Sequence, residues 1–209
     1  KVFGNVLKYI KMTASSNFGN MFSMIGASAL LPFLPMLPVQ VLLNNLMYDF
    51  SQTAVASDEV DAEYLAKPRQ WDLKAIARFM VYIGPISSIF DYCTFAFLWF
   101  VLGADSGTHQ RLFQTGWFVE SLLTQTLIVH VIRTGKIPFL ESRASLPLTI
   151  TGVAICLIGM ILPFSAVAPW FGFVPLPGIY WLFLAAVIVA YMGLTQFVKT
   201  RMIRHFGVI

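Results

Sequence analysis

Long runs of apolar residues follow one another along almost the whole chain, separated by short polar or proline-rich connections. A helix that crosses a membrane needs about 20 consecutive, mostly apolar residues. Only 11% of the 209 residues are charged, whereas a soluble domain carries about 25%. The mean hydropathy is +0.74. The sequence therefore predicts an integral membrane protein without a separate soluble domain.

The apolar runs predict an all-α fold, a six-helix transmembrane bundle that forms one domain over residues 1–209. Pro32, Pro35 and Pro38 make a tight connection after the first run, because proline cannot continue a helix. Gly84-Pro85 predicts a kink in the third run. The predicted spans cover approximately residues 6–31, 39–55, 75–102, 112–132, 145–167 and 179–198.

Basic residues give the bundle a predicted orientation. With six spans, both termini lie on one side of the membrane, and all 14 Lys and Arg residues except Arg111 fall on that side. The positive-inside rule then places both termini in the cytoplasm. The expected partner is a lipid bilayer and not nucleic acid. Tryptophans near the predicted span ends are expected to anchor the interfaces; they are Trp99, Trp117, Trp170 and Trp181.

Two polar strings interrupt the first two apolar runs. They are Ser15-Ser16-Asn17-Phe18-Gly19-Asn20 and Asn44-Asn45-Leu46-Met47-Tyr48-Asp49. An ionised acid at the centre of a membrane helix costs about 2.5–3.5 kcal/mol, so such residues are functional candidates. On helices, Asn17 shares a face with Asn20, and Asn45 shares a face with Asp49. Hard cations such as Mg²⁺ take oxygen ligands of this kind.

The first two spans are therefore predicted to form an oxygen cage for a cation, with Gly19 allowing close approach. Ser16, Asn44 and Tyr48 lie next to the cage residues and are candidates for the ion path. An alternative is that the amides only bond one another across helices, as polar contacts within a membrane scaffold.

Two further acids lie at membrane depth. Asp91 follows Ser87 and Ser88, and we expect it to pair structurally with these serines or with Tyr92. Glu120 is a candidate for the ion path or for proton exchange. No catalytic residue is predicted, because the sequence holds no glycine-rich phosphate loop and no segment large enough for a nucleotide.

The two polar strings are similar to those of the bacterial magnesium-transporting P-type ATPases. In that family the Ser-Ser-Asn-x-Gly pattern lies on the fifth transmembrane helix, and Asn-x-x-x-Asp lies on the sixth. Asn20 stands where calcium pumps carry a carboxylate. The resemblance covers essentially the whole chain and rests on these strings: Met12 to Asn20, Leu43 to Asp49, Ile83-Gly84-Pro85 with Ser87 to Asp91, and Gln125-Thr126-Leu127 followed by His130 and Arg133-Thr134.

The resemblance implies helices five to ten of a pump in a bacterial inner membrane, with a chain that begins at Lys1 in mid-protein. Asn17, Asn20, Asn45 and Asp49 would bind Mg²⁺ as the imported ion. ATP would bind to domains outside this chain, so the chain alone would not be catalytic. The loop Asp58 to Lys74 would meet the phosphorylation domain. A stand-alone secondary cation transporter or channel is the alternative, and it would favour inverted repeats, which the sequence does not display.

Overall fold

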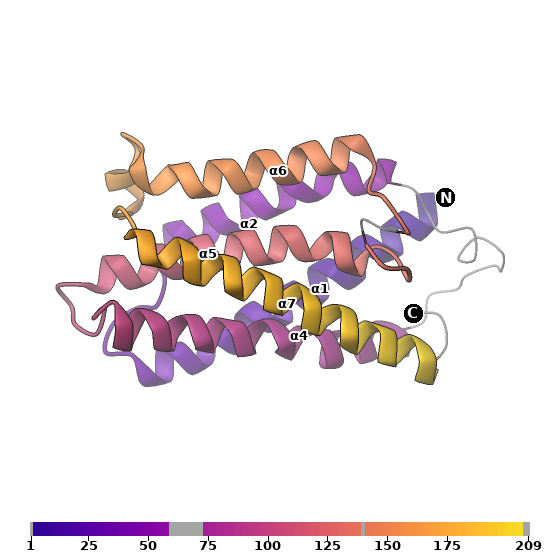
Figure 1. The fold of residues 1–209 in the computed structure, drawn as a ribbon, viewed down its shortest axis with the longest axis horizontal. Coiled ribbons are helices and arrows are strands. Elements are labelled where there is room, and N and C mark those ends of the chain that lie inside the picture. The colour runs from indigo at the N-terminus through magenta and orange to yellow at the C-terminus, as the bar shows by residue number, and fades with distance from the viewer. Residues whose placement is uncertain (1, 59–72, 139–140, 207–209) are drawn as a thin grey trace.

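The computed structural model describes residues 2–58, 73–138 and 141–206. In this part of the chain, long helices lie side by side, and both chain ends lie at the same end of the bundle (Figure 1). The described residues form no named β-strand, so the all-α prediction is confirmed. The long helices are α1 (Val2–Leu30), α2 (Pro38–Gln52), α4 (Leu73–Ala96), α5 (Gln110–Ile132), α6 (Leu146–Ile161) and α7 (Gly178–Phe206).

Helix ends differ from the predicted span ends where proline or polar residues intervene. The helix α6 ends at Ile161 and not near residue 167, because Pro163 follows in a 3₁₀ turn. The helix α7 instead runs past residue 198 to Phe206. Pro85 lies inside α4. Short turns of other helix types are Thr53–Ser57, Leu162–Phe164 and Ala168–Phe171 (3₁₀) and Phe97–Val101 (π).

The helix α5 is the central element of the bundle. It packs against α1, α2, α4, α6 and α7, and almost every side chain from Phe113 to Val131 is buried. A helix surrounded by others on all sides can carry polar residues that lipid would not accept. This position explains how Glu120, Thr124 and Gln125 are accommodated.

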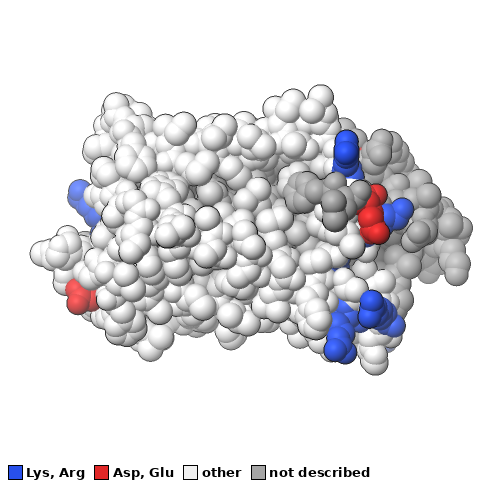
Figure 2. Space-filling model, in the orientation of Figure 1, with Lys and Arg blue, Asp and Glu red and all other residues white. Residues whose placement is uncertain are grey.

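Three helical segments are long and apolar enough by themselves to cross a membrane, among the residues that the structure describes: Leu73–Val101, Leu146–Phe164 and Gly178–His205. Six spans were expected. The remaining helices α1, α2 and α5 carry most of the amide and hydroxyl side chains, and α2 has only 15 residues. On the face in Figure 2, charged side chains lie at the two ends and an uncharged belt separates them. This distribution is typical of a bundle whose middle lies in lipid.

Candidate functional site

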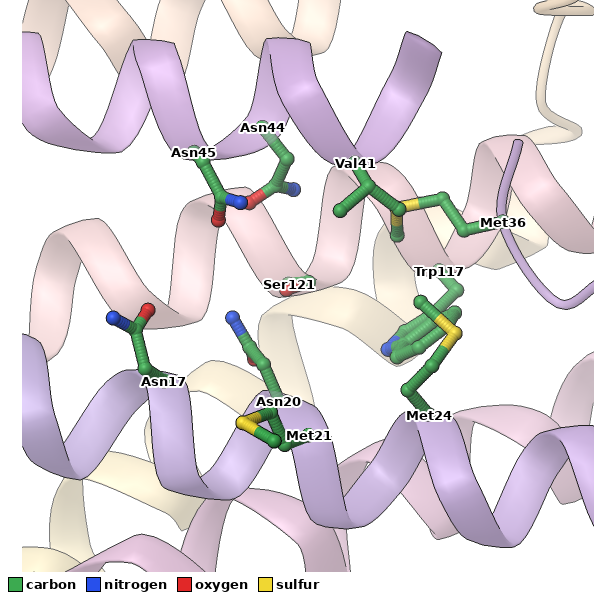
Figure 3. Close-up of a pocket in the computed structure, with 10 residues that line it drawn as sticks. All are labelled: Asn17, Asn20, Met21, Met24, Met36, Val41, Asn44, Asn45, Trp117 and Ser121. Carbon is green, nitrogen blue, oxygen red and sulfur yellow. The ribbon is translucent and has the colours of Figure 1, made fainter. Parts of the chain in front are cut away.

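A cavity of about 350 Å³ lies between α1 and α2. Figure 3 shows amide side chains from the two helices directed toward one another, with Trp117 and Ser121 of α5 behind them. The helix α1 packs mainly on α4, whereas α2 packs on α5 and α6, so the first two helices do not close on each other. The lining residues are Asn17, Asn20, Met21, Met24, Met36, Val41, Asn44, Asn45, Trp117 and Ser121.

Gln125 of α5 bridges α1 and α2 beside this cavity. Its Oε1 accepts hydrogen bonds from Ser16 Oγ and Asn20 Nδ2, each at 3.2 Å. Its Nε2 donates to Oδ1 of Asn44, and Asn44 Nδ2 donates to the carbonyl oxygen of Phe118 at 3.2 Å. The amides therefore bond across helices, as in the alternative of polar contacts. Asn20 and Asn44 also line the cavity, where a cation could reach their amide oxygens.

The predicted ligands differ in their surroundings. Asn17, Asn20 and Asn45 line the cavity, and Asn17 and Asn45 are exposed on its open side. Asp49 is exposed as well, but it is not among the lining residues. The helical spacing of four residues still places Asp49 on the same face of α2 as Asn45, one turn along. The structure therefore brings together the predicted amides and leaves the carboxylate at the edge.

Ser16, Asn44 and Tyr48, the candidates for the ion path, turn toward the interior. Asn44 and Tyr48 are each 3% exposed. Ser16, Asn20 and Tyr48 line a second, less open cavity of about 20 Å³, together with Gln125 and Asp91. Such a volume holds about one water molecule. Gln125 is the residue that sequence reasoning missed. Its signals were its place on the turn after Glu120 and its position in one of the strings on which the resemblance rests.

The prediction that Asp91 pairs with Ser87, Ser88 or Tyr92 is wrong. Ser87 donates to the carbonyl oxygen of Gly84, Ser88 to that of Gly19 and Tyr92 to that of Phe22. Asp91 instead accepts hydrogen bonds from Ser23 and Trp117.

Trp117 corrects a second prediction, because it is not an interfacial anchor. Its side chain is 2% exposed in the main core of the bundle. Its indole Nε1 donates to Asp91 Oδ1 at 2.9 Å, while Ser23 Oγ donates to Asp91 Oδ2 at 2.5 Å. The sequence position near a span end did not reveal this role, since the partner lies on another helix.

The polar side chains that line the site offer oxygen atoms as metal ligands, beside the thioether groups of Met21, Met24 and Met36. Within the described ranges, no group of three or more His, Cys, Asp or Glu side chains could hold a metal ion. Amide oxygens with a single carboxylate nearby suit a hard cation that keeps part of its water shell. The loop Asp58 to Lys74 was expected to meet another domain, and its residues 59–72 lie outside the described residues.

Known proteins are similar in sequence to this chain. A family model described as cation transporting ATPase, C-terminus, matches residues 33–201. The magnesium-transporting ATPases, P-type 1, of Salmonella typhimurium (strain LT2) and Escherichia coli (strain K12) are each 52% identical to the chain over 207 residues. The match covers 99% of this chain and 23% of each relative. The chain therefore belongs to the cation-transporting ATPase family and corresponds to the C-terminal part of its members.

Proposed function

We propose that this chain is the ion-carrying membrane part of a P-type pump that imports Mg²⁺ at the expense of ATP. The observation that carries the proposal is the cavity between α1 and α2, lined by Asn17, Asn20, Asn44 and Asn45. Side-chain amide oxygens from two helices converge there, and none of the described residues that line the cavity is charged. The names of the relatives support Mg²⁺ as the cargo.

The exposed side of this cavity supports a ligand set that other parts of the pump complete. Asn17, Asn45 and Asp49 face outward from the bundle, where an exposed carboxylate would be unfavourable in lipid. Helices from the remaining three-quarters of the pump would cover this side and add oxygen ligands. The same missing parts would bind ATP and become phosphorylated, so that their motion changes access to the site.

In this arrangement Asn17, Asn20, Asn45 and Asp49 bind the ion, and Ser16, Asn44, Tyr48 and Glu120 line its path. The pump lies in a bacterial inner membrane with both termini of this chain in the cytoplasm. Mg²⁺ prefers octahedral coordination and gives up water reluctantly. One carboxylate with neutral amides therefore gives enough attraction to bind the ion and still allows it to leave.

The test is Mg²⁺ uptake by the complete pump in proteoliposomes, measured with a magnesium-sensitive dye. Asp49→Asn and Asn20→Ala should each raise the Mg²⁺ concentration needed for half-maximal uptake by at least about tenfold, because even outer-shell ligand partners are worth about 10–100-fold in affinity. Asp105→Asn, in the exposed loop before α5, is the matched control and should leave uptake unchanged.

A normal half-maximal Mg²⁺ concentration in both Asp49→Asn and Asn20→Ala would contradict the proposed site. Uptake that persists without ATP would instead favour the secondary transporter or channel. Size-exclusion profiles that match the wild type establish that the variants are folded, so that a loss of uptake reports on the site.

A further inference from the structure

Three side-chain amides form a hydrogen-bonded chain beside the open cavity. The chain runs from Asn44 on α2 through Gln125 on α5 to Asn20 on α1, and Figure 3 shows its two end members on opposite helices. Asn44 and Gln125 are 3% and 5% exposed, whereas Asn20 is only partly buried. An amide donates through its nitrogen and accepts through its oxygen. The orientation of each amide in such a chain therefore depends on the orientation of its neighbour.

The backbone carbonyl of Phe118 fixes the direction of this chain at one end. A carbonyl oxygen only accepts hydrogen bonds, so Asn44 turns its Nδ2 toward it and donates at 3.2 Å. Asn44 Oδ1 then faces Gln125 and accepts from its Nε2. Gln125 in turn presents its Oε1 to α1, where Asn20 Nδ2 donates to it at 3.2 Å. Reversing any one of these amides would bring two donors or two acceptors face to face.

The oxygen of Asn20 is the free end of the chain. Its Nδ2 is bound to Gln125, and no group among the described residues donates to its Oδ1. The oxygen and nitrogen of an amide point in different directions, so this oxygen points away from Gln125. Asn20 also lines the open cavity. The atom that a hard cation requires is therefore the one that the chain leaves available there.

Gln125 does not itself have a free oxygen for a cation. Its Oε1 accepts from Ser16 Oγ and from Asn20 Nδ2, each at 3.2 Å, and a carbonyl oxygen has two lone pairs. Gln125 lines the smaller cavity and is not among the residues that line the open one. Asn44 does line the open cavity, but its oxygen already accepts from Gln125. Both residues would therefore affect a bound cation through Asn20.

We propose that Gln125 is a positioning residue of the cation site, which binds the amide nitrogen of Asn20 and so directs the oxygen of Asn20 to the cation. Outer-shell partners hold the ligands of metal sites in the same way. Without Gln125, the amide of Asn20 rotates and turns its N–H groups, which repel a cation, into the cavity. This inference deepens the proposed function and rests on it, because the cation is the Mg²⁺ of that proposal.

Mg²⁺ uptake by the complete pump in proteoliposomes tests the positioning role. Gln125→Met keeps the length of the side chain and removes its hydrogen bonds. It should raise the Mg²⁺ concentration for half-maximal uptake by about tenfold, as loss of an outer-shell partner does, with little change in the maximal rate. In an Asn20→Ala background the same substitution should have no further effect, because no oxygen is left to position.

Gln114→Met is the matched control. Gln114 lies on the same helix, is 1% exposed and donates to the carbonyl oxygen of Leu34 at 2.8 Å, but it is not among the residues that line either cavity. Its substitution should lower the unfolding temperature and leave the half-maximal Mg²⁺ concentration unchanged. The control therefore separates loss of a buried hydrogen bond from loss of ligand orientation.

An unchanged half-maximal Mg²⁺ concentration in folded Gln125→Met would overturn the positioning role and leave only a structural one. Effects of Gln125→Met and Asn20→Ala that multiply in the double variant would also overturn it, because Gln125 would then act as a ligand of its own. A wild-type pump without Mg²⁺ uptake would contradict the proposed function, and the positioning role with it. Normal uptake in the wild type and in Gln125→Met would overturn the positioning role alone.

If Gln125→Met does not fold, Asn44→Ala decides. This substitution removes the fixed end of the chain, so that Gln125 and Asn20 adopt both orientations. The half-maximal Mg²⁺ concentration should rise about twofold, since only about half of the molecules then present the oxygen, and the rise should disappear in the Asn20→Ala background. An absent rise, or one that persists without Asn20, would overturn the proposal.

Discussion

Lys199 shows at the scale of a single residue how the bundle accommodates charge. It lies in α7 and is 1% exposed. Its ammonium group donates to the carbonyl oxygens of Val131, Thr134 and Lys136, at 2.8, 3.0 and 3.1 Å. These carbonyls lie at and just beyond the C-terminus of α5, where helical carbonyls lack partners and positive charge is favourable. One side chain thus fixes the end of the central helix to α7.

Replacing Lys199 with Met should lower the free energy of unfolding by about 3 kcal/mol, because hydrogen bonds from a charged group contribute about 1.5–3 kcal/mol and buried carbonyls would lose their donor. Unfolding in mixed micelles with increasing SDS measures this change. Lys136→Met removes an exposed ammonium group and keeps the backbone carbonyl, so it should leave stability close to the wild-type value. Equal stability of the two variants would contradict the capping role.

At the scale of elements, α1 and α4 approach closely along a seam of small residues. A side-chain carbon at Gly19 would overlap Ser87 Oγ and lie 2.8 Å from the carbonyl oxygen of Gly84. A carbon at Gly84 would lie 2.8 Å from Cδ1 of Phe18. Ser88 Oγ also donates to the carbonyl oxygen of Gly19 at 3.1 Å. Close packing and interhelical hydrogen bonds are what hold helices together in lipid. The prediction that Gly19 permits close approach is therefore confirmed, with α4 as the neighbour.

Gly19→Ala should destabilise the protein by about 1–3 kcal/mol, the usual effect of overpacking, and should also weaken Mg²⁺ binding, since Asn17 and Asn20 lie on either side of this glycine. Thermal unfolding in detergent and the uptake assay measure the two effects. Gly193→Ala, where an added carbon meets nothing within 4 Å, is the control. It should be neutral or slightly stabilising, because alanine favours the helix. A stable Gly19→Ala protein with normal uptake would show that α1 has room to move.

At the scale of the whole molecule, Asp58 joins several elements at the end of the bundle where the termini lie. It is fully buried. Arg133, at the end of α5, donates to both of its carboxylate oxygens, with the shorter contact at 3.0 Å. Lys8 of α1 lies 3.5 Å away, and the backbone N–H of Ser145, before α6, donates to Oδ1 at 3.0 Å. Asn5 Nδ2 donates to its carbonyl oxygen at 2.9 Å. A single acid therefore ties α1, α5 and α6 together.

Asp58→Asn should lower the free energy of unfolding by about 3–5 kcal/mol, because it leaves Arg133 buried without a counter-charge. The double variant Asp58→Asn/Arg133→Met should lose less than the two single changes added together, since no buried charge then lacks its partner. SDS unfolding of the three proteins gives the coupling energy. Additive effects would mean that Asp58 and Arg133 stabilise the fold independently.

The sequence by itself determined the helices, the position of the two amide strings and the concentration of basic residues on one side, because hydropathy and helical spacing are local properties. It also indicated that Asn17, Asn20 and Asn45 belong to one site. Only the tertiary structure decided that Gln125 joins them, that Asp91 accepts hydrogen bonds from Ser23 and Trp117, and that Asp58 connects three helices. These contacts depend on how each helix is rotated about its axis and on which helix becomes its neighbour. Packing of the whole bundle sets both, and no single segment carries that information.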